Sequence, residues 1–183
     1  MVRAFERRSI DEAVVDRVLD AARRTPSAGN SQGLDLLVID DPEQYWAMTF
    51  PGDRSTFRWQ GLFDAPVLVV PIVDPDAYAR RYAEADKAAT GLGHVDAWSV
   101  PYWWIDGGMA VQNLLLAAVD EGLGALLFGI FEHEPTVLAA FGVPPGRRAL
   151  GVIALGHPAP DEPGRSASRP RRGLAEITHR GRW

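Results

Sequence analysis

Residues 106–121, DGGMAVQNLLLAAVDE, form the strongest predicted helix of the chain, and they are apolar on nearly every side. Asp106 is placed to cap the first turn, and Gly122 is placed to end the helix. The apolar side chains are Met109, Val111, Leu114, Leu115, Leu116 and Val119. A helix of this kind belongs at the centre of a core or against a partner. The rest of the chain must therefore supply apolar surfaces that enclose it.

Short apolar segments on both sides of this helix predict the strands of such a core. Residues 34–39, LDLLVI, and residues 65–73, APVLVVPIV, are the clearest, and the unbroken run of the second indicates burial on both faces. Pro71 in that run favours an edge position or a bulge. Further strands are expected in GALLFGIF, which starts at Gly124, and in ALGVIALG, residues 149–156.

Other segments predict helices. A capping box with the sequence SIDE, starting at Ser9, begins a helix that runs to about Arg24, where Pro26 stops it. Residues 76–86 predict a solvated helix, and residues 135–141 predict a short one.

The composition limits the classes of function. The chain has 183 residues, enough for one domain, and a net charge of -5, which argues against a nucleic-acid binder. It has no cysteine, so disulfides, thiolate zinc sites and cysteine nucleophiles are excluded. Its histidines are far apart, and no metal site is expected. The sequence shows no apolar signal or spanning segment, which predicts a cytoplasmic protein without membrane contact.

The stretch TPSAGNSQ, residues 25–32, is the candidate site for an organic cofactor. The sequence has no nucleophile elbow and no P-loop, so an enzyme here is expected to take its chemistry from such a group. Gly29 allows close approach, and the polar side chains offer donors and acceptors for ring amides and a polyol chain. A long capped turn with solvated side chains explains the same residues equally well.

An aromatic segment before the central helix is open to two interpretations. Its members crowd around one proline and are either core aromatics on a loop or a lid over a flat ligand. They are Trp98, Tyr102, Trp103 and Trp104.

The tail, residues 158–183, is polar and rich in proline and arginine, as disordered tails are. Its last apolar residues instead favour docking on the body or on a second subunit. They are Leu174, Ile177 and Trp183.

The order of these motifs resembles the nitroreductase family of FMN-dependent oxidoreductases. AARRTPSAGNSQ is similar to the flavin-binding loop of that family, and VRAF at residues 2–5 is similar to the end of its N-terminal arginine-rich motif. DAPVLVV resembles its second core strand, and DGGMAVQNLLLAAVDEGLGALLFGIF resembles its central helix and flavin-side loop. ALGVIALGHP and RPRRGLAEITHRGRW resemble its last strand and phosphate-binding tail. The resemblance covers nearly the whole chain except about residues 44–61 and 76–105.

The resemblance implies an α+β fold in which a mixed β-sheet is flanked by helices, with residues 1–183 as a single domain. It implies an intertwined, obligate homodimer with FMN sites at the interface. The all-round apolar helix would then pack the core on one side and its twin on the other. The tail, residues 158–183, would dock on the body or on the partner subunit.

The resemblance also assigns roles to residues. Arg3 matches the basic position near the flavin pyrimidine edge, where a cation stabilises negative charge on the reduced ring. Arg58 or Gln60, just before the second strand, is placed to reach the pyrimidine. The positions that line the ring and the ribityl chain are matched by Pro26, Ser27, Ala28, Asn30 and Gln32. The backbone that faces the ring and its N5 side is matched by Phe128, Gly129 and Ile130, and the basic pair for the phosphate is matched by Arg169 and Arg171.

The implied activity is that of a ping-pong oxidoreductase. NAD(P)H passes hydride to flavin N5, and a flat aromatic acceptor such as a nitroaromatic or a quinone then takes its place. No side chain is needed as an obligatory acid or base, so no catalytic residue is assigned. The aromatic segment at residues 98–104 is expected to shape the acceptor pocket. No residue marks a 2′-phosphate pocket, so NADH, NADPH and a deazaflavin all stay open as the donor.

Several alternatives remain. A variant enzyme on the same fold would destroy the flavin with oxygen or carry out reductive dehalogenation. A non-catalytic flavin-binding or storage protein would hold FMN that NAD(P)H does not bleach. A purely structural dimer would bind neither.

One departure from the family pattern concerns the N-terminal motif. That motif usually reads Arg-Arg-Ser, one residue, then a basic residue, and Arg3 matches the last position. The RRS at residues 7–9 is displaced and is better explained as a helix cap. We therefore expect FMN to bind more weakly than is usual for this family. A dissociation constant in the nanomolar range or below would contradict this.

Overall fold

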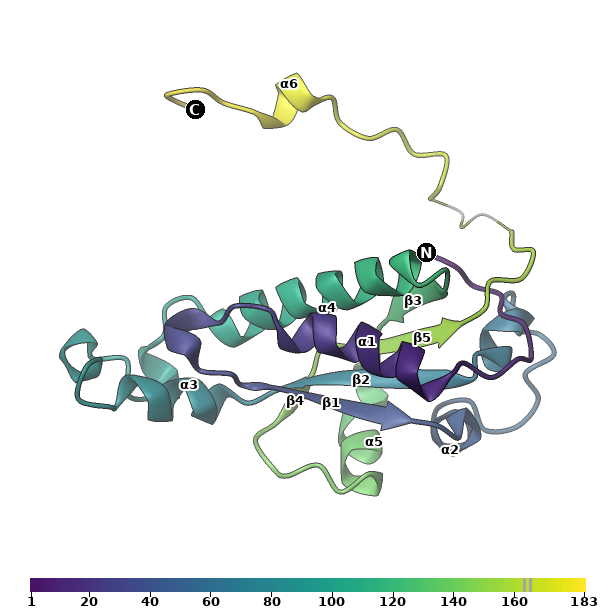
Figure 1. Cartoon of the computed structure of the whole chain (residues 1–183), viewed down its shortest axis with the longest axis horizontal. Helices are drawn as coiled ribbons and strands as arrows, with labels where there is room; N and C mark the ends of the chain where they lie inside the picture. The colour runs from purple at the N-terminus through teal and green to yellow at the C-terminus, as the bar shows by residue number, and fades with distance from the viewer. Residues whose placement is uncertain (163, 165) are drawn as a thin grey trace.

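A β-sheet between two layers of helices forms the body of the protein, as the computed structural model in Figure 1 shows. The structure describes residues 1–162, 164 and 166–183. The strands are β1 (Leu34–Ile39), β2 (Val67–Val73), β3 (Gly124–Phe128), β4 (Arg148–Ala149) and β5 (Val152–Gly156). Their hydrogen-bonded order is β1-β2-β5-β3, and β4 also pairs with β2.

The strand directions correct one expectation. Every strand pair among the described residues is antiparallel, so the α+β fold is confirmed but the sheet within one chain is not mixed. β2 and β3 run in the same direction, as strands joined by a helical crossover do. They are not neighbours, because β5 lies between them and runs the opposite way.

The helices cover both faces of the sheet because the side chains of β2 alternate between them. Val67 and Val69 pack with α1 and α4, whereas Leu68 and Val70 pack with α2 and α5. The predicted burial of this strand on both faces is thereby confirmed. The helices are α1 (Glu12–Arg23), α2 (Pro42–Thr49), α3 (Pro75–Tyr82), α4 (Tyr102–Asp120), α5 (Glu134–Ala140) and α6 (Leu174–Ile177). Short 3-10 turns are η1 (Ala28–Asn30), η2 (Gln60–Asp64), η3 (Ala88–Thr90), η4 (Val95–Ala97) and η5 (Phe131–His133).

A β-bulge interrupts the sheet opposite Pro71. β2 pairs with β5 as far as Val69 and with β4 from Ile72, and the partner has one more residue than β2 between these two points. The Leu150 amide donates to the Pro71 carbonyl at 2.9 Å. Gly151 has a φ of +133°, a value that favours glycine, and so accommodates the bulge. The bulge that the proline favoured is confirmed.

Two helix starts differ from the predicted ones. The carboxylate of Asp11 caps α1 by accepting a first-turn amide at 2.9 Å, so the predicted capping box at Ser9 is wrong. α4 starts at Tyr102, about one turn before the predicted cap Asp106. The extended backbone of Pro101 starts the helix there, which leaves the Asp106 carboxylate inside the helix and free for another role.

α4 has one buried side and one apolar side that faces outward. Leu114 and Ala118 are fully buried in the cluster with α1 and the sheet. On the other side, Leu116 and Val119 are 58% and 68% exposed. The outward stripe also carries Tyr102, Ile105 and Met109. Contiguous exposed apolar surface of this kind is typical of a protein interface.

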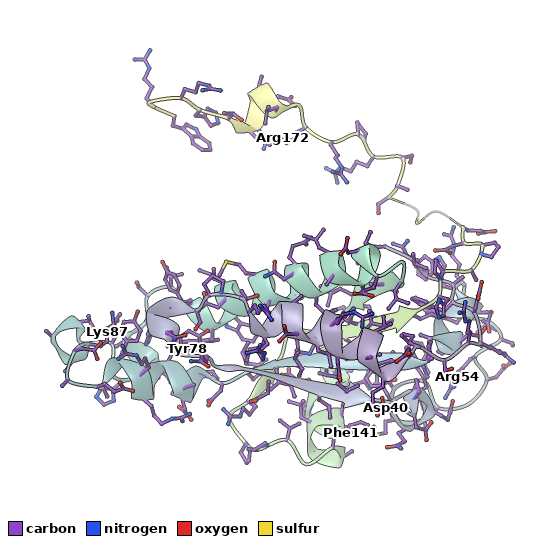
Figure 2. All side chains as sticks on the ribbon, in the orientation of Figure 1. Asp40, Arg54, Tyr78, Lys87, Phe141 and Arg172 are labelled. Atoms are coloured by element: carbon purple, nitrogen blue, oxygen red, sulfur yellow. The ribbon has the colours of Figure 1, made fainter. Side chains whose placement is uncertain are left out.

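The chain beyond residue 165 extends away from the body. Figure 1 shows α6 on this segment, and Figure 2 shows Arg172 on it, well separated from the helical layers. Leu174 and Trp183 are exposed, so docking of the tail stays a prediction. Among the described residues, no helix has the length and apolarity that would be needed to cross a membrane.

Candidate functional site

The loop between α1 and β1 adopts an unusual backbone conformation. Gly29, Asn30 and Gln32 have φ values of 62°, 56° and 51°, which are uncommon for residues other than glycine. Two side-chain hydrogen bonds within the loop support this shape: Ser27 Oγ accepts from the Gln32 amide at 2.9 Å, and Ser31 Oγ donates to the Ala28 carbonyl at 2.6 Å. A strained loop that is fixed in this way is a recurrent feature of binding sites.

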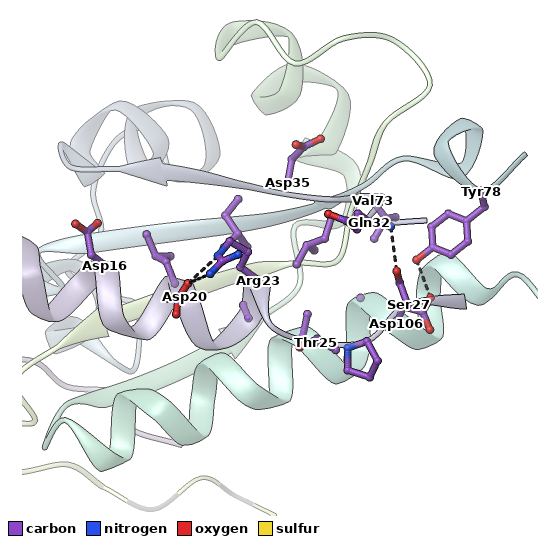
Figure 3. Close-up of a pocket in the computed structure, with 18 residues that line it drawn as sticks. Asp16, Asp20, Arg23, Thr25, Ser27, Gln32, Asp35, Val73, Tyr78 and Asp106 are labelled. Atoms are coloured by element: carbon purple, nitrogen blue, oxygen red, sulfur yellow. Dashed lines mark hydrogen bonds and ion pairs between the residues drawn. The ribbon is translucent and has the colours of Figure 1, made fainter. Parts of the chain in front are cut away.

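Longer-range contacts also anchor the same loop. Asp106 Oδ2 accepts from the Ala28 amide and from the Tyr78 hydroxyl, both at 2.8 Å. Figure 3 shows the bond from Tyr78. Arg81 donates through Nε to the Gly29 carbonyl at 2.8 Å. Asp106 is only 6% exposed. Tyr78, which belongs to α3, is also buried, so α3 is not the solvated helix that the sequence predicted. The residue predicted to cap α4 thus connects that helix to the loop.

The protonation of Tyr78 is well defined. Burial raises the pKa of the Tyr78 hydroxyl, and the hydrogen bond to the Asp106 carboxylate raises that pKa further. Tyr78 therefore keeps its proton near neutral pH and acts as a donor to Asp106.

A cavity of about 430 Å³ lies beside the loop. Pro26, Ser27 and Gln32 line it, together with parts of α1, β1 and α4 (Figure 3). Its apolar lining includes Leu34, Leu36, Val73 and Ala110, and its charged lining includes Asp16, Asp20, Arg23, Asp35 and Asp106. The arginines at positions 24 and 23 hold the pKa of the Asp20 carboxyl below its usual range, so Asp20 is an ionised partner of both guanidinium groups.

A second cavity, of about 440 Å³, lies on the other side of the loop. It is lined by Ala28, Tyr82, Leu92, Trp98, Ser99, Val100 and Tyr102. This lining carries no charged side chain and has aromatic rings on several sides. The Trp98 indole donates to the Leu92 carbonyl at 3.0 Å, which holds the ring in place. The ring also makes an edge contact with Tyr82, with the two ring centres 4.7 Å apart. The cavity suits a neutral, flat ligand.

Only two of the four aromatic residues that were predicted to shape one pocket line the same cavity. Trp98 and Tyr102 line the second cavity, but Trp103 is buried against Val73 and Trp104 packs under the Arg148 guanidinium at 5.6 Å. The reason is local geometry, because residues 102–104 lie in the first turn of α4 and successive helical side chains point about 100° apart. The sequence interpretation treated them as one loop surface.

Arg3 and Arg58 meet at the opposite end of the sheet. Their guanidinium groups lie 5.3 Å and 5.4 Å from the ring centre of Trp59. The Arg3 amide donates to Asp161 at 2.7 Å, and Arg58 pairs with Glu162 at 3.7 Å. Trp59 was not predicted, although its position in FRWQ next to Arg58 is a signal that could have been used.

The predicted flavin-side stretch at the end of β3 turns its side chains inward. Phe128 stacks on Trp46 with ring centres 5.7 Å apart, and Ile130 is buried. The backbone of Gly129 is left on the outside. Phe131, which was not predicted, has a φ of +45°, is 79% exposed, and places its ring against Gly129.

The predicted cofactor residues therefore fall into separate groups within one chain. The register places the loop near Leu34 and Val73 at one end of β2, and Arg3 near Val67 at the other. With a rise of about 3.3 Å per residue, these ends are roughly 20 Å apart. Figure 2 shows Tyr78 and Lys87 at the loop end and Arg54 at the other. Arg169 and Arg171 are exposed on the tail, and no contact within the described part of the chain joins them to either group.

Comparisons with known proteins identify the family and the fold. A model of the nitroreductase family matches residues 1–157. A protein of Archaeoglobus fulgidus, assigned as an NADH dehydrogenase or NAD(P)H nitroreductase, is 28% identical over 160 residues, which cover 86% of this chain and 79% of that protein. The 5,6-dimethylbenzimidazole synthase of Rhodospirillum rubrum is 27% identical over 179 residues, which cover 88% of this chain and 79% of that protein.

Solved structures share the fold. A protein of Desulfovibrio desulfuricans, assigned as a nitroreductase and solved in complex with FMN, is 27% identical with a TM-score of 0.68. The match covers 97% of this chain and 88% of that chain.

Proposed function

The chain belongs to the nitroreductase family, and from this premise we propose that it is an FMN-dependent oxidoreductase that uses NAD(P)H to reduce a flat aromatic acceptor. The observation that carries the proposal is the loop at residues 25–32, whose left-handed positions turn polar side chains outward beside a cavity of about 430 Å³. A mere connecting turn needs neither the strain nor the buried carboxylate that anchors it.

The side chains present fit the chemistry of FMN. The carboxamides of Asn30 and Gln32 have no hydrogen-bond partner among the described residues and suit the ring amides and the ribityl hydroxyls. Gly129 has no side chain, and its backbone already has one planar ring against it, that of Phe131, whose place a bound flavin ring would have to take. Arg169 and Arg171 on the tail suit bidentate contacts with a phosphate.

Arg3 would give electrostatic help to reduction. Its guanidinium is the basic group at the pyrimidine-side position, and a fixed cation there stabilises negative charge that develops on the ring. Arg58, beside the same indole ring, adds a second cation at this end of the sheet.

The site is complete only in an intertwined homodimer. The loop and Arg3 lie at opposite ends of the sheet, so one flavin cannot contact both within one chain. A second copy seated on the apolar stripe of α4, which includes Leu116 and Val119, would bring the loop of one subunit towards Arg3 of the other. The tail, residues 158–183, would dock on the partner subunit and carry its arginines to the phosphate.

Bound FMN would supply the redox chemistry, taking hydride at N5 from NAD(P)H and returning it to an acceptor such as a nitroaromatic or a quinone. The chain positions the partners. Trp98, Tyr82 and Tyr102 offer an uncharged aromatic cavity next to the loop, which favours a neutral acceptor. No side chain has to serve as an obligatory acid or base.

A second candidate is oxygen-dependent destruction of the flavin. It is favoured by the similarity to the Rhodospirillum rubrum 5,6-dimethylbenzimidazole synthase, because that product contains the same dimethylated benzene ring with two adjacent nitrogens as a flavin. Analysis of the products after aerobic incubation with reduced FMN separates the two activities. Consumption of flavin would favour the second, and its unchanged recovery the first.

The proposal is tested by absorption spectroscopy of the purified protein with FMN, followed by anaerobic NADH or NADPH. Bound oxidised flavin absorbs at about 370 and 450 nm, and bleaching of these bands by either donor is the expected result. Bands that resist both donors would favour a flavin-storage protein. The absence of flavin binding would contradict the proposal.

A further inference from the structure

Asp106 lies where three parts of the proposed site meet. Its Oδ2 accepts from the Ala28 amide and from the Tyr78 hydroxyl, each at 2.8 Å. Ala28 belongs to the loop and lines the aromatic cavity, while Asp106 itself lines the cavity on the other side of the loop. One buried oxygen thus connects the backbone of the loop to α3 and α4.

The Tyr78 ring extends this connection to the aromatic cavity. It packs edge-on against Trp98 and Trp103, whose ring centres lie 5.9 Å and 6.0 Å from its own. Trp98 lines that cavity, and Trp103 anchors the first turn of α4 in the core. The orientation of Tyr78, fixed by its bond to Asp106, therefore influences both the loop and the acceptor side.

From this geometry we propose that Asp106 is a positioning residue: it fixes the Ala28 amide and the Tyr78 hydroxyl, and so sets the shape of the loop that receives FMN. The proposal rests on the proposed function for the identity of the cofactor. A charged acceptor is well suited to the task, because a carboxylate holds an amide and a hydroxyl more strongly than a neutral oxygen does. The backbone of Gly29 and Asn30 has positive φ angles and would relax if the Ala28 amide were released.

The contact can be tested first without a substitution. In wild-type protein labelled with ¹⁵N and ¹³C and free of flavin, a scalar coupling across the hydrogen bond should join the Ala28 amide nitrogen to the Asp106 side-chain carbon. Slow hydrogen exchange at the Ala28 amide should accompany it. A rapidly exchanging amide without this coupling would overturn the proposal.

Variants then test the consequence for binding. Asp106→Leu removes the acceptor but fills the space, Asp106→Ala removes it outright, and Asp106→Asn keeps one oxygen in the same place. We expect Asp106→Leu and Asp106→Ala to lose protection at Ala28 and to weaken FMN binding roughly tenfold or more, as loss of a charge-assisted hydrogen bond implies. Asp106→Asn should recover most of the affinity.

Glu134→Ala is the matched control. The Glu134 carboxylate also accepts a backbone amide, that of Ala149 at 2.8 Å, but it does so on α5 and away from the loop. A similar loss of thermal stability with unchanged FMN affinity is expected. Equal weakening of FMN binding in Glu134→Ala and Asp106→Leu would reduce the role of Asp106 to general stability and overturn the proposal.

The outcomes also separate this inference from the proposed function. If wild-type protein binds no FMN, the proposed function fails, and the Ala28 exchange rates alone decide the role of Asp106. If wild-type protein binds FMN and Asp106→Leu binds it equally well with a protected Ala28 amide, only the positioning role fails. Should the Leu and Ala variants not fold, the coupling measured in wild-type protein decides.

Discussion

The ring of Phe131 lies directly against the backbone of Gly129, so that a Cβ atom on residue 129 would overlap it. Gly129→Ala should displace the ring. Because the ring is already 79% exposed, the expected loss in the free energy of unfolding is only about 1 kcal/mol. FMN affinity should fall more clearly, since residue 129 is a proposed flavin-facing position. Thermal unfolding and FMN titration check both, and adding Phe131→Ala to this variant should relieve the overlap but not restore FMN affinity.

Arg3 and Arg7 give a matched pair at the N-terminus. Arg3→Gln should weaken FMN binding roughly tenfold, because it removes a cation proposed to lie beside the pyrimidine. Arg7→Gln should leave the affinity unchanged, since the side chain of Arg7, as far as the structure describes its surroundings, makes only an exposed ion pair with Asp64 at 2.7 Å. Fluorescence titration of FMN measures both. A larger effect at Arg7 would mean that the RRS segment is the true flavin motif.

The apolar stripe on α4 predicts the assembly. Leu116→Glu combined with Val119→Glu should convert a dimer into a monomer, because both side chains are exposed in the single chain and would be buried between two copies. Loss of FMN binding should accompany dissociation. Size-exclusion chromatography with light scattering checks the mass, and Thr136→Glu on α5 is the control. A wild-type protein that is already monomeric would contradict the proposed dimer.

The aromatic cavity predicts that substitutions of Tyr102 and Trp103 change different properties: the first changes acceptor kinetics, and the second changes stability. Tyr102→Ala should raise KM for a quinone, because Tyr102 lines the cavity, and should destabilise the fold less than loss of a buried ring does, because Tyr102 is 43% exposed in the single chain. Trp103→Ala should instead lower the free energy of unfolding by about 3–5 kcal/mol, as expected for a large aromatic removed from a core. Steady-state kinetics and urea denaturation separate them. Equal KM values in wild type and Tyr102→Ala would argue against this cavity as the acceptor site.

Glu134 predicts a pH dependence of stability. The Arg148 hydrogen bond holds the pKa of the Glu134 carboxyl below its ordinary value of 4.5, and the bond from the Ala149 amide acts in the same direction. A lowered folded-state pKa gives stability that is fully present above the unfolded pKa and is lost as pH falls through the folded one. Wild type should therefore exceed Glu134→Gln by about 1 kcal/mol at neutral pH, with a smaller difference below pH 4.5.

Urea denaturation of both proteins across this range gives the comparison. The exposed Glu132 supplies the control, since Glu132→Gln should show no such difference. A gap between wild type and Glu134→Gln that stays constant down to pH 3 or so would show that the carboxylate charge contributes nothing.

Much of the fold follows from local patterns in the sequence. The run LDLLVI gives β1 at its predicted bounds, and Pro71 marks the bulge, because both signals depend on residues that are adjacent in the chain. The direction of the strands was not predictable in this way. It depends on β5 entering between β2 and β3, which is a long-range event without a local signature.

The candidate site was predictable only where local motifs mark its residues, for the same reason. The loop, Arg3 and Gly129 are marked by sequence motifs, but the role of Asp106 is not. An aspartate before an apolar helix is indistinguishable from a cap until the helix is seen to start at Tyr102. Its partner Ala28 lies far away in the chain, so only the packing of α4 against the loop could reveal the contact.

The bulge between β4 and β5 changes which residues of this chain segment face each layer of helices. In an unbroken strand Ala149 would share a face with Ile153, yet it packs in the cluster that holds Val152 and Ala154. The extra residue thus shifts the alternation of side chains by one position, so that Ala149 faces the same layer of helices as Val152 and Ala154. A chain one residue shorter at Gly151 could keep either the buried face of β5 or the Glu134 contact of Ala149, but not both. The length of this short connection is therefore as tightly constrained as the identity of the core residues around it.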